Sequence, residues 1–541
     1  MKKLLKPKYI TTPIYYVNAA PHLGHLYSSV LAETARKWYE FQGYPTMLST
    51  GTDEHGTKVA QAAQLAKMQP KEYCDKTSQQ FRELADFARV KYTDFIRTTS
   101  PDHIQTVSRL WQKIADNGYI YKGSHKGWYC IGDEAYYAEH EVEEVADPKT
   151  NTKFVQSKIS KKPVEWYEED NYFFKLSAFR TKLIDLIEKN ELKIYPETVQ
   201  QSILRELSLG TEDLSVSRPV SRVDWAIPVP NDPSQTMYVW IDALANYLVP
   251  ARYPWSSAEE MTANGWPPDM HIIGKDIQRF HCIYWPAFLL AANIPLPKSI
   301  IVHSHWTVDG VKMSKSIGNV VDPFLLIQRF TRPPVNLFLL GDSNLENDGD
   351  YSDEKLLLRY EIQLRRKYGN LVSRLQSKSF NIPNAVKQHF SSNQEDILLK
   401  PEYASVFSNG FISEIDTLRD RVEESMEMLN TAKALREIWL IISASNKYID
   451  DCAPWAFKGS EESQIVQNEI IFRAVEAVRV STLLLQVFIP EIPSNVLDSL
   501  GVHPDRRSFE YAAYGADPTY GTLDVRKHQH PVPRLQEADL L

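Results

Sequence analysis

Cysteine is scarce in this sequence, with four residues among 541. They are Cys74, Cys130, Cys282 and Cys452, and no two lie close enough along the chain to form a paired motif. Disulfide-dependent secreted domains are much richer in cysteine, and zinc knuckles need C-x-x-C pairs. The composition therefore excludes a disulfide framework and favours a reducing compartment.

Long apolar runs are also missing. The longest, at about 283–296, is interrupted by Pro286 and Pro295, and it predicts a buried helix and not a membrane span. The sequence has no overall basic excess either, because its net charge is −8. This excludes a protein that is basic throughout, but it leaves room for a local basic face that binds phosphates.

The order of predicted elements indicates a parallel α/β sheet in the first part of the chain. Residues 7–16 predict a strand, 26–41 a helix and 46–50 a second strand. The aromatic, charged and irregular stretch 118–223 predicts an insertion between two halves of the sheet. Further helices are predicted at 72–90 and 104–117, and further strands at 237–244, 270–276 and 298–308.

Beyond residue 353 the pattern is almost wholly helical, which predicts a bundle. A Pro/Gly/Tyr-rich tail of roughly 40 residues follows, and we expect it to pack over other domains. The bundle helices are expected at 354–378, 412–429, 431–449 and 463–487.

The stretch APHLGHLYSS, residues 20–29, lies where the first strand turns into the first helix. His22 and His25 are three positions apart, so in a first helical turn their rings face the same way and can donate to phosphate oxygens. Gly24 would let a nucleotide approach the backbone closely, and a helix N-terminus at this edge of a sheet favours phosphate. A metal-binding pair or two surface histidines are the alternatives.

A second polar stretch, VKMSKSIGN at 311–319, places Lys312 and Lys315 three positions apart with Gly318 behind them. Such a loop suits an anion, and the glycine would let it close and reopen. A solvated turn is the alternative, because Lys/Ser-rich turns are common.

PHLGH at 21–25 together with KMSKS at 312–316 resembles the two signature sequences of class I aminoacyl-tRNA synthetases. The stretches TPIYYVNAAPHLGH, STGTDEHG, VWIDALANYL and IGKDIQRFHCIYWP, with the later NLVSR and APW, are similar to methionyl-tRNA synthetases over about 8–460. The resemblance implies a Rossmann-type catalytic domain split by an insertion and followed by an all-α anticodon-binding domain. The expected boundaries are 1–117 and 225–325 for the catalytic halves, 118–224 for the insertion, 326–355 for a connecting module, 356–500 for the bundle and 501–541 for the tail.

By resemblance, the chain is expected to be a methionine–tRNA ligase that uses ATP with Mg²⁺ to form methionyl-adenylate and then charges tRNA(Met). In this chemistry catalysis is positioning and neutralisation of phosphate charge, with little covalent work for the protein. The implied catalytic residues are His22 and His25, which hold phosphates, Lys315, which neutralises the departing pyrophosphate, and Lys312 as its helper. The other implied ATP contacts are Gly24, Gly274, Asp276, Trp306, Ser314 and Ser316.

Methionine recognition is the most family-specific part of the resemblance. Asp53 is similar to the carboxylate that pairs with the substrate ammonium, and the alternative is an N-cap aspartate for a helix at 57–65. A soft, unbranched side chain is selected by aromatic walls with one or two polar contacts to sulfur. The implied pocket residues, each of which would also suit a core, are Ile14, Tyr16, Trp240, Ala243, Leu244, Tyr247, Phe280 and His281. Many relatives have proline where this chain has Leu244.

The insertion departs from relatives that bind zinc through cysteine knuckles. Only Cys130 is present, and His125 and His140 lack a paired spacing with it. Structural zinc typically takes about four nitrogen or sulfur ligands. We therefore expect no structural zinc, as in the simplified mitochondrial and bacterial type.

The helical part of the chain is expected to read RNA. Residues 354–378 carry a basic face, on which Asn370 and Arg374 meet at i, i+4. By resemblance these two residues and Trp455 read the anticodon, since unpaired bases are recognised by stacking and by hydrogen bonds to their edges. A solvated basic face and a packed tryptophan are the alternatives.

The expected partners are L-methionine, ATP and tRNA(Met), with no membrane, in a monomer of the mitochondrial matrix or, alternatively, the bacterial cytoplasm. The start MKKLLKPKYI lacks the arginine and serine of a transit peptide, so any targeting segment is expected to have been removed. One rival is a class I synthetase for valine, isoleucine, leucine or cysteine, of which the editing enzymes carry a larger insertion and the cysteine enzyme needs zinc. The other is a catalytically silent tRNA-binding relative, against which the intact histidines and lysines of the two signatures argue.

Overall fold

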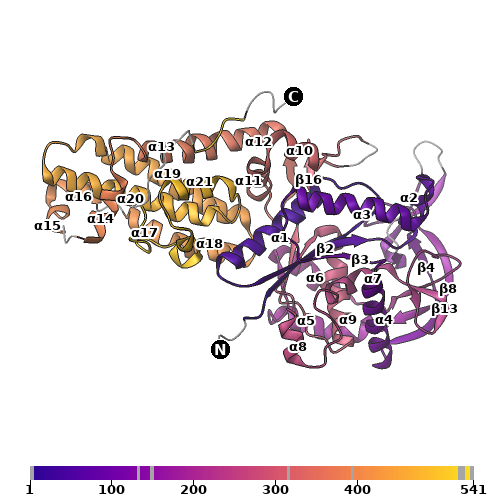
Figure 1. The fold of residues 1–541 in the computed structure, drawn as a ribbon. Coiled ribbons are helices and arrows are strands. Elements are labelled where there is room, and N and C mark those ends of the chain that lie inside the picture. The colour runs from indigo at the N-terminus through magenta and orange to yellow at the C-terminus, as the bar shows by residue number, and fades with distance from the viewer. Residues whose placement is uncertain are drawn as a thin grey trace. The chain divides into compact units, whose positions relative to one another are not determined.

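The computed structural model describes residues 5–130, 135–146, 152–313, 317–391, 395–407, 410–521 and 531–535 (Figure 1). The chain divides into two compact units: Met1–Pro21 with Thr46–His303, and His22–Pro45 with Ser304–Leu541. Within the described ranges, no helix has both the length and the apolarity to cross a membrane.

The first unit is built on a six-stranded sheet in which every pairing is parallel. Parallel sheets are covered on both faces, and β14 and β15 are accordingly buried along their whole length. The predicted parallel α/β sheet is thus confirmed. Its strand order is β3 (Asp94–Arg97), β2 (Thr46–Asp53), β1 (Lys8–Tyr16), β14 (Met270–Gly274), β15 (Ser299–His303) and β9 (Lys193–Tyr195).

The prediction of a strand at 237–244 is wrong. Strand β13 (Asp232–Met237) ends there, and helix α7 (Val239–Leu244) and a 3₁₀ turn (Ala245–Leu248) follow. A short apolar run does not distinguish a buried strand from a buried helix, and here tertiary packing overrides the β preference of its valine, isoleucine and aromatic residues. The helices predicted at 72–90 and 104–117 are confirmed as α3 (Pro70–Phe87) and α4 (Pro101–Asp116), each with proline in its first turn.

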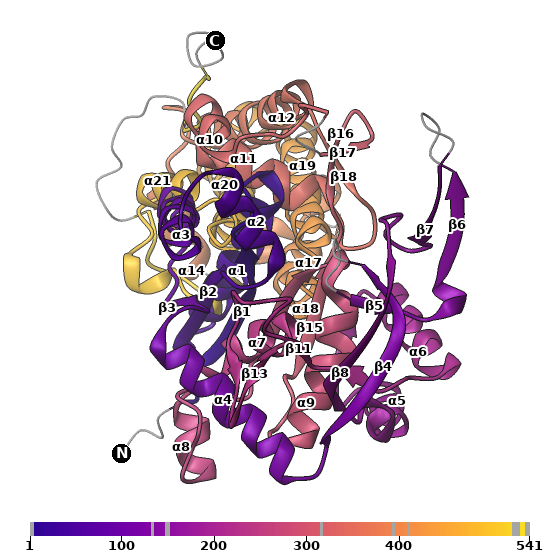
Figure 2. The same cartoon turned by 90° about the vertical axis from the view of Figure 1, so that its right-hand side faces the viewer.

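The expected insertion contains a second sheet. Its long antiparallel pair, β4 (Ile120–Cys130) and β8 (Glu165–Phe174), curves together in Figure 2, with the two-stranded ribbon β6 (Val142–Ala146) and β7 (Lys153–Ser157) nearby. Strand β9 also falls inside 118–224, yet it pairs with β15 as the edge strand of the parallel sheet. The insertion therefore contributes a strand to the sheet that it was expected only to interrupt.

The second unit contains α1 (Leu23–Phe41) and the predicted helical bundle, drawn in orange and yellow in Figure 1. Helix α20 (Glu461–Leu485) is buried all round from Val466 onward, as expected for the central helix of a bundle, and packs against α19 (Thr431–Cys452). Helix α12 (Asp353–Arg359), a π-helical stretch (Tyr360–Gly369) and α13 (Asn370–Leu375) follow one another without a break.

The described part of the C-terminal tail packs on α20. Glu476 and Arg479 form an ion pair with no exposed side-chain surface. Arg479 donates to the backbone oxygens of Tyr511 at 2.7 Å and Ala513 at 2.8 Å, and the Gly515 N–H donates to Glu476 Oε1 at 2.8 Å. A buried ion pair of the bundle is thus completed by the tail.

Candidate functional site

The first turn of α1 is capped by its two histidines. His22 is the N-cap, and its Nδ1 accepts from the Gly24 N–H at 3.0 Å, while His25 Nδ1 accepts from the His22 N–H at 3.0 Å. The ring centroids lie 3.9 Å apart. A nitrogen that accepts a hydrogen bond carries no proton, so in the neutral rings the proton is on Nε2. The cap therefore fixes each imidazole as an Nε2–H donor.

Gly24 is required by this cap. A Cβ at Gly24 would lie 2.9 Å from Cε1 and 3.1 Å from Nδ1 of His22, closer than side chains pack. The glycine thus makes room for the His22 ring itself. The close approach of a nucleotide to Gly24 stays a prediction.

The second signature belongs to the same unit as α1. Lys312 is exposed at the end of β17 (Val311–Lys312), and Gly318 adopts a φ of +76°, which favours glycine. The Leu23 N–H donates to the backbone oxygen of Val321 at 3.2 Å, so the segment just after this signature is bonded to the first turn of α1. Ser314, Lys315 and Ser316 lie outside the described residues.

Trp306, in β16 (Trp306–Val308), is 2% exposed. Its ring centroid lies 5.7 Å from that of Tyr27 on α1 and 5.3 Å from that of Phe338, and a Cβ on Gly349 would meet it at 2.9 Å. The indole is thus a core support beneath α1. Its expected place beside the adenine stays a prediction.

Asp53 ends β2 directly opposite Tyr16 at the end of β1, at the carboxyl edge of the sheet where α/β proteins bind ligands. The N-cap of helix α2 (Thr57–Leu65) is Gly56, so the alternative of Asp53 as a capping residue is wrong. Asp53 is 6% exposed. On β14, which pairs with the other side of β1, Gly274 ends the strand, and a Cβ there would lie 2.7 Å from Oδ1 of the exposed Asp276.

The residues expected to form an apolar pocket lie on two helical segments and on strand β1 of the first unit. The ring of Trp240 on α7 stacks on that of Phe280, with centroids 3.6 Å apart and planes 8° from parallel. The Tyr247 hydroxyl lies 2.7 Å from Nε2 of His281. Ala243 and Leu244 are buried on α7, while Ile14 and Tyr16 on β1 are half-buried.

The polar groups of this pocket satisfy one another. His281 Nδ1–H donates to the backbone oxygen of Ile277 at 3.0 Å, which leaves Nε2 as the acceptor for the Tyr247 hydroxyl. Burial lowers the pKa of His281 to about 4, so the ring is neutral at pH 7, and burial raises the pKa of Tyr247. The Tyr247–His281 pair is therefore uncharged at pH 7.

Three residues near the pocket were missed by sequence reasoning. Asp242 on α7 accepts from His55 Nδ1 and from His103 Nε2, each at 2.6 Å. These partners lie 187 and 139 residues from Asp242 along the chain, and no spacing or motif connects them. His55, inside GTDEHG, and Asp242, inside VWIDALANYL, stand in stretches that the sequence singled out, whereas His103 does not.

The expected RNA-reading residues gather at one end of the bundle. Arg374 on α13 is ion-paired with Asp450 near the end of α19, with Nη2 and Oδ1 2.5 Å apart. Trp455 lies in the 3₁₀ turn that follows α19 (Pro454–Ala456) and is 46% exposed. Asn370 is exposed at the start of the same short helix as Arg374.

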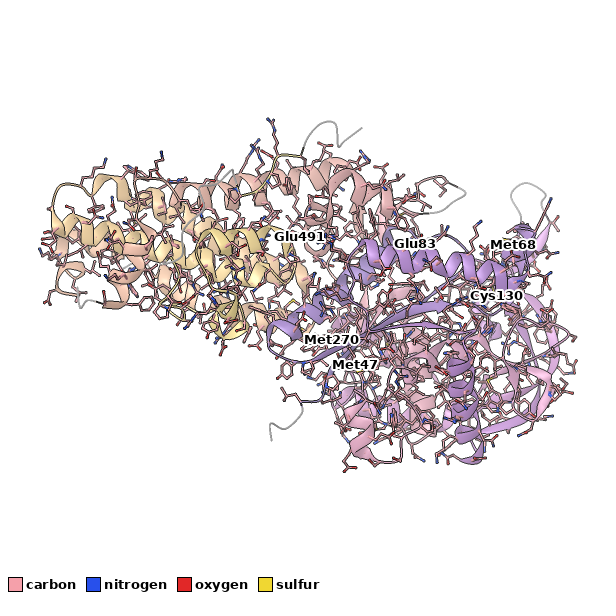
Figure 3. The ribbon with its side chains drawn as sticks, viewed as in Figure 1. Met47, Met68, Glu83, Cys130, Met270 and Glu491 are labelled. Carbon is pink, nitrogen blue, oxygen red and sulfur yellow. The ribbon has the colours of Figure 1, made fainter. Side chains whose placement is uncertain are left out.

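Among the described side chains, no three or more His, Cys, Asp or Glu residues are grouped to hold a metal ion. Cys130, labelled on the insertion in Figure 3, is fully buried in a small apolar cluster with Tyr137, Val142 and Val164. A thiol packed among apolar side chains does not fit a zinc site with its usual four ligands.

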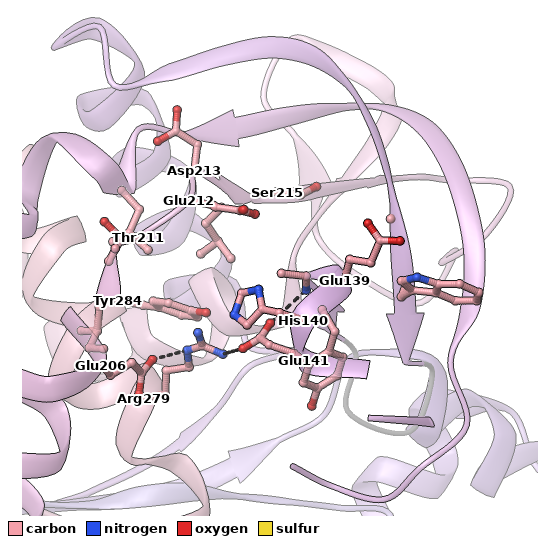
Figure 4. A pocket seen from close by; sticks show the side chains of 18 of the residues that line it. Glu139, His140, Glu141, Glu206, Thr211, Glu212, Asp213, Ser215, Arg279 and Tyr284 are labelled. Atoms are coloured by element: carbon pink, nitrogen blue, oxygen red, sulfur yellow. Dashed lines mark hydrogen bonds and ion pairs between the residues drawn. The ribbon is translucent and has the colours of Figure 1, made fainter. Parts of the chain in front are cut away.

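A separate cavity of about 570 Å³ lies in the first unit (Figure 4). Its lining carries both acidic and basic side chains, and Arg279 forms ion pairs to Glu206 at 2.6 Å and Glu141 at 3.6 Å. None of the described residues that line it is among those expected to bind methionine or ATP.

Comparison with known proteins shows two family matches. Residues 8–376 match the model for class I tRNA synthetases (M), and 406–515 match the anticodon-binding domain of methionyl-tRNA ligase. The chain is 42% identical over 520 residues to a probable mitochondrial methionine–tRNA ligase of Neurospora crassa, covering 96% of this chain and 83% of that protein. It is 41% identical to the mitochondrial methionine–tRNA ligase of Saccharomyces cerevisiae, covering 98% and 97%. Mycobacterium tuberculosis methionyl-tRNA synthetase in complex with methionyl-adenylate superposes with a TM-score of 0.86 at 35% identity, covering 98% of this chain and all of that one.

Proposed function

The chain belongs to the class I methionyl-tRNA synthetase family and is a methionine–tRNA ligase, and from this premise we propose how its side chains divide the reaction. The methionine carboxylate attacks the α-phosphate of ATP, which forms methionyl-adenylate and releases pyrophosphate. The methionyl group then passes to the terminal adenosine of tRNA. Negative charge grows on phosphate oxygens in the first step, so donors and cations fixed near them lower the barrier.

We assign the phosphate-binding role to His22 and His25. Their Nδ1 atoms are occupied by the helix cap, so each presents an Nε2–H donor without reorganisation. Lys312 and Lys315 offset the charge of the leaving pyrophosphate. The role of Lys315 is proposed from its position in the KMSKS motif alone. The hydrogen bond from Leu23 to Val321 supports this pairing, because it links the cap to the segment that follows the second signature.

The remaining contacts to ATP are proposed by resemblance to the family. Mg²⁺ would arrive with the triphosphate, since it keeps most of its waters and needs no protein cage of its own. It would neutralise phosphate charge when bound. The residues proposed to make these remaining contacts with ATP are Gly24, Gly274, Asp276, Trp306, Ser314 and Ser316.

The methionine pocket is proposed in the first unit. Asp53 pairs with the substrate ammonium at the edge of the sheet, and the stacked Trp240 and Phe280 give a polarizable wall for the thioether. Because Tyr247 and His281 already bond to each other, a polar side chain entering there would have to break that bond. Ile14, Tyr16, Ala243 and Leu244 complete the proposed lining.

For tRNA(Met), we assign anticodon reading to Asn370, Arg374 and Trp455. The exposure of Trp455 supports a stacking role, and the ion pair of Arg374 to Asp450 places this arginine at the same end of α19. We further propose that the protein is a monomer without structural zinc. We also propose that it works in the mitochondrial matrix, because both relatives named above are mitochondrial; the bacterial cytoplasm is the alternative.

The test of these assignments is Lys315→Ala. Methionine-dependent ATP–pyrophosphate exchange should slow by about a hundredfold or more while the methionine Kd stays within about twofold, since the lysine acts on the transition state. Lys355→Ala is the matched control, because Lys355 is a half-exposed lysine of the same unit that pairs with Asp350. An exchange rate for Lys315→Ala equal to that of the control would refute the role.

A further inference from the structure

Asp242 joins three parts of the first unit that are distant in sequence. It lies on α7, while His55 lies between β2 and α2 and His103 lies on α4. Both contacts measure 2.6 Å, one to each carboxylate oxygen. All three side chains are buried, at 1%, 5% and 0% exposure for Asp242, His55 and His103.

The carboxylate at the centre of this network is charged. Burial raises the pKa of Asp242, but the contacts with His55 and His103 outweigh it and lower the pKa to about 2. His103 Nδ1 has no hydrogen-bond partner within the described structure, and the ring contacts Asp242 through Nε2. A buried carboxylate holds its place firmly when each oxygen has such a donor.

Helix α7 depends on contacts of this kind. It has six residues, and its N-cap Tyr238 makes no side-chain hydrogen bond to the first turn. Isolated helices shorter than about 12 residues are marginal in water, so α7 must be held from outside. The same short helix carries Trp240, Ala243 and Leu244 of the proposed methionine pocket.

The other end of the network reaches the segment that holds Asp53. His55 follows Asp53 by two positions, and Glu54 between them is fully buried. Arg97 on β3 donates to both Glu54 oxygens, at 2.6 and 2.9 Å. The segment is therefore anchored on one side to the sheet through Glu54 and on the other to α7 through His55.

We propose that Asp242 is a positioning residue for methionine recognition, which through His55 and His103 holds the α7 wall of the pocket and the ammonium-binding Asp53 at a fixed spacing. This inference rests on the proposed roles of Asp53 and of the α7 residues. Asp242 itself makes no contact with methionine in this arrangement. Its loss should weaken methionine binding and leave ATP binding nearly unchanged.

The test compares Asp242→Asn with Asp269→Asn in the full chain. Asp269 is the matched control: it is also buried, paired with Lys6, Lys8 and Lys298, and it precedes β14 at the opposite, amino end of the same sheet. In methionine-dependent ATP–pyrophosphate exchange, Asp242→Asn should raise the methionine KM by about tenfold or more, with the ATP KM within about twofold. Asp269→Asn should leave both within about twofold, even with a comparable loss of thermal stability.

A second pair of variants isolates the hydrogen bond. His103→Gln keeps an N–H donor near the position of Nε2, so its methionine KM should stay within about threefold of the parent, whereas His103→Leu should resemble Asp242→Asn. If Asp242→Asn does not fold, the comparison of these two variants decides the question. A methionine KM in His103→Leu equal to that in His103→Gln would overturn the proposal.

The outcomes are distinguishable from a failure of the proposed function. A parent protein without methionine-dependent exchange would contradict the function itself. If the parent is active, two results would contradict only the positioning role. One is a methionine KM of Asp242→Asn within about twofold of that of the parent, and the other is an equal increase of the methionine KM in Asp242→Asn and Asp269→Asn.

Discussion

At the scale of single residues, the histidines of the first signature have two duties that use different atoms. Nδ1 of each ring caps α1, and Nε2–H remains the donor that we assign to phosphate. Serine, threonine and aspartate are the usual N-caps, but ionised aspartate has no donor, and a serine or threonine hydroxyl donates from the same atom that caps and does not reach the position of Nε2. Two substitutions can separate these duties.

His25→Asn should keep the cap and lose the donor at the Nε2 position, because the asparagine amide oxygen can take the place of Nδ1 while its N–H groups stop short of Nε2. We expect thermal stability near that of the parent and an activation rate lower by about ten- to a hundredfold, the loss typical of one transition-state hydrogen bond.

His25→Gln should do the reverse: it keeps a donor near Nε2 and loses about 1 kcal/mol of capping. Exchange kinetics and thermal denaturation measure both effects, and a fully active His25→Asn would refute the phosphate role.

His281 makes stability depend on pH. Its pKa falls from 6.5 to about 4 on folding because the ring is buried, so the unfolded chain binds the extra proton between these values. Stability therefore falls as pH drops from about 6.5 to about 4, by up to about 3 kcal/mol for this ring. Buried His271, whose pKa is also lowered by burial, acts in the same direction.

The measurement for His281 is urea unfolding at several pH values across this window. His281→Gln retains an acceptor for the Tyr247 hydroxyl but cannot titrate, so its stability should fall less than that of the parent. Identical pH profiles for the two proteins would show that His281 is not the titrating group.

At the scale of elements, the sequence predicted the sheet, the first helix and the bundle because each has a strong period or lies beside a recognisable motif. Residues 237–244 were predicted as a strand, because valine, isoleucine and tryptophan favour strands when a run is too short to show a period. Candidate site residues could be named from the sequence where a motif contains them, as with His22 and Lys312. The network of Asp242 was not, since only the folded chain brings His55 and His103 to it.

The C-terminal tail should be part of the stability of the bundle. Truncation after Leu500 removes three backbone partners of the buried Glu476–Arg479 pair, each worth about 1–3 kcal/mol when its polar group is left unsatisfied. We expect a clear drop in the unfolding temperature of the bundle, measured by calorimetry. Truncation after Gly521 keeps these contacts and is the control; an equal drop in both would contradict the role of residues 511–515.

At the scale of the whole molecule, activation and tRNA recognition are assigned to different parts of the chain. Trp455→Ala should lower kcat/KM for tRNA(Met) by about 5- to 150-fold, the range expected for one lost base-stacking contact. Methionine-dependent pyrophosphate exchange should be unchanged. Leu440→Ala, which removes another exposed side chain of the bundle, should alter neither activity. A loss of exchange activity in Trp455→Ala would contradict this division.

The proposed compartment can be tested by expressing the protein from its native gene with a C-terminal fluorescent tag and imaging the cells. Co-localisation with mitochondria is the expected outcome, in line with the mitochondrial relatives. A diffuse cytoplasmic signal would contradict it. Charging of mitochondrial tRNA(Met) by the purified protein would then connect the compartment to the substrate.

The most direct test of the whole account is ATP–pyrophosphate exchange with each of the standard amino acids in turn, followed by aminoacylation of tRNA(Met). We predict exchange with methionine alone, a sharp loss of that exchange in Lys315→Ala, and transfer of methionine to tRNA(Met). Exchange driven by another amino acid, or none with methionine, would contradict the account.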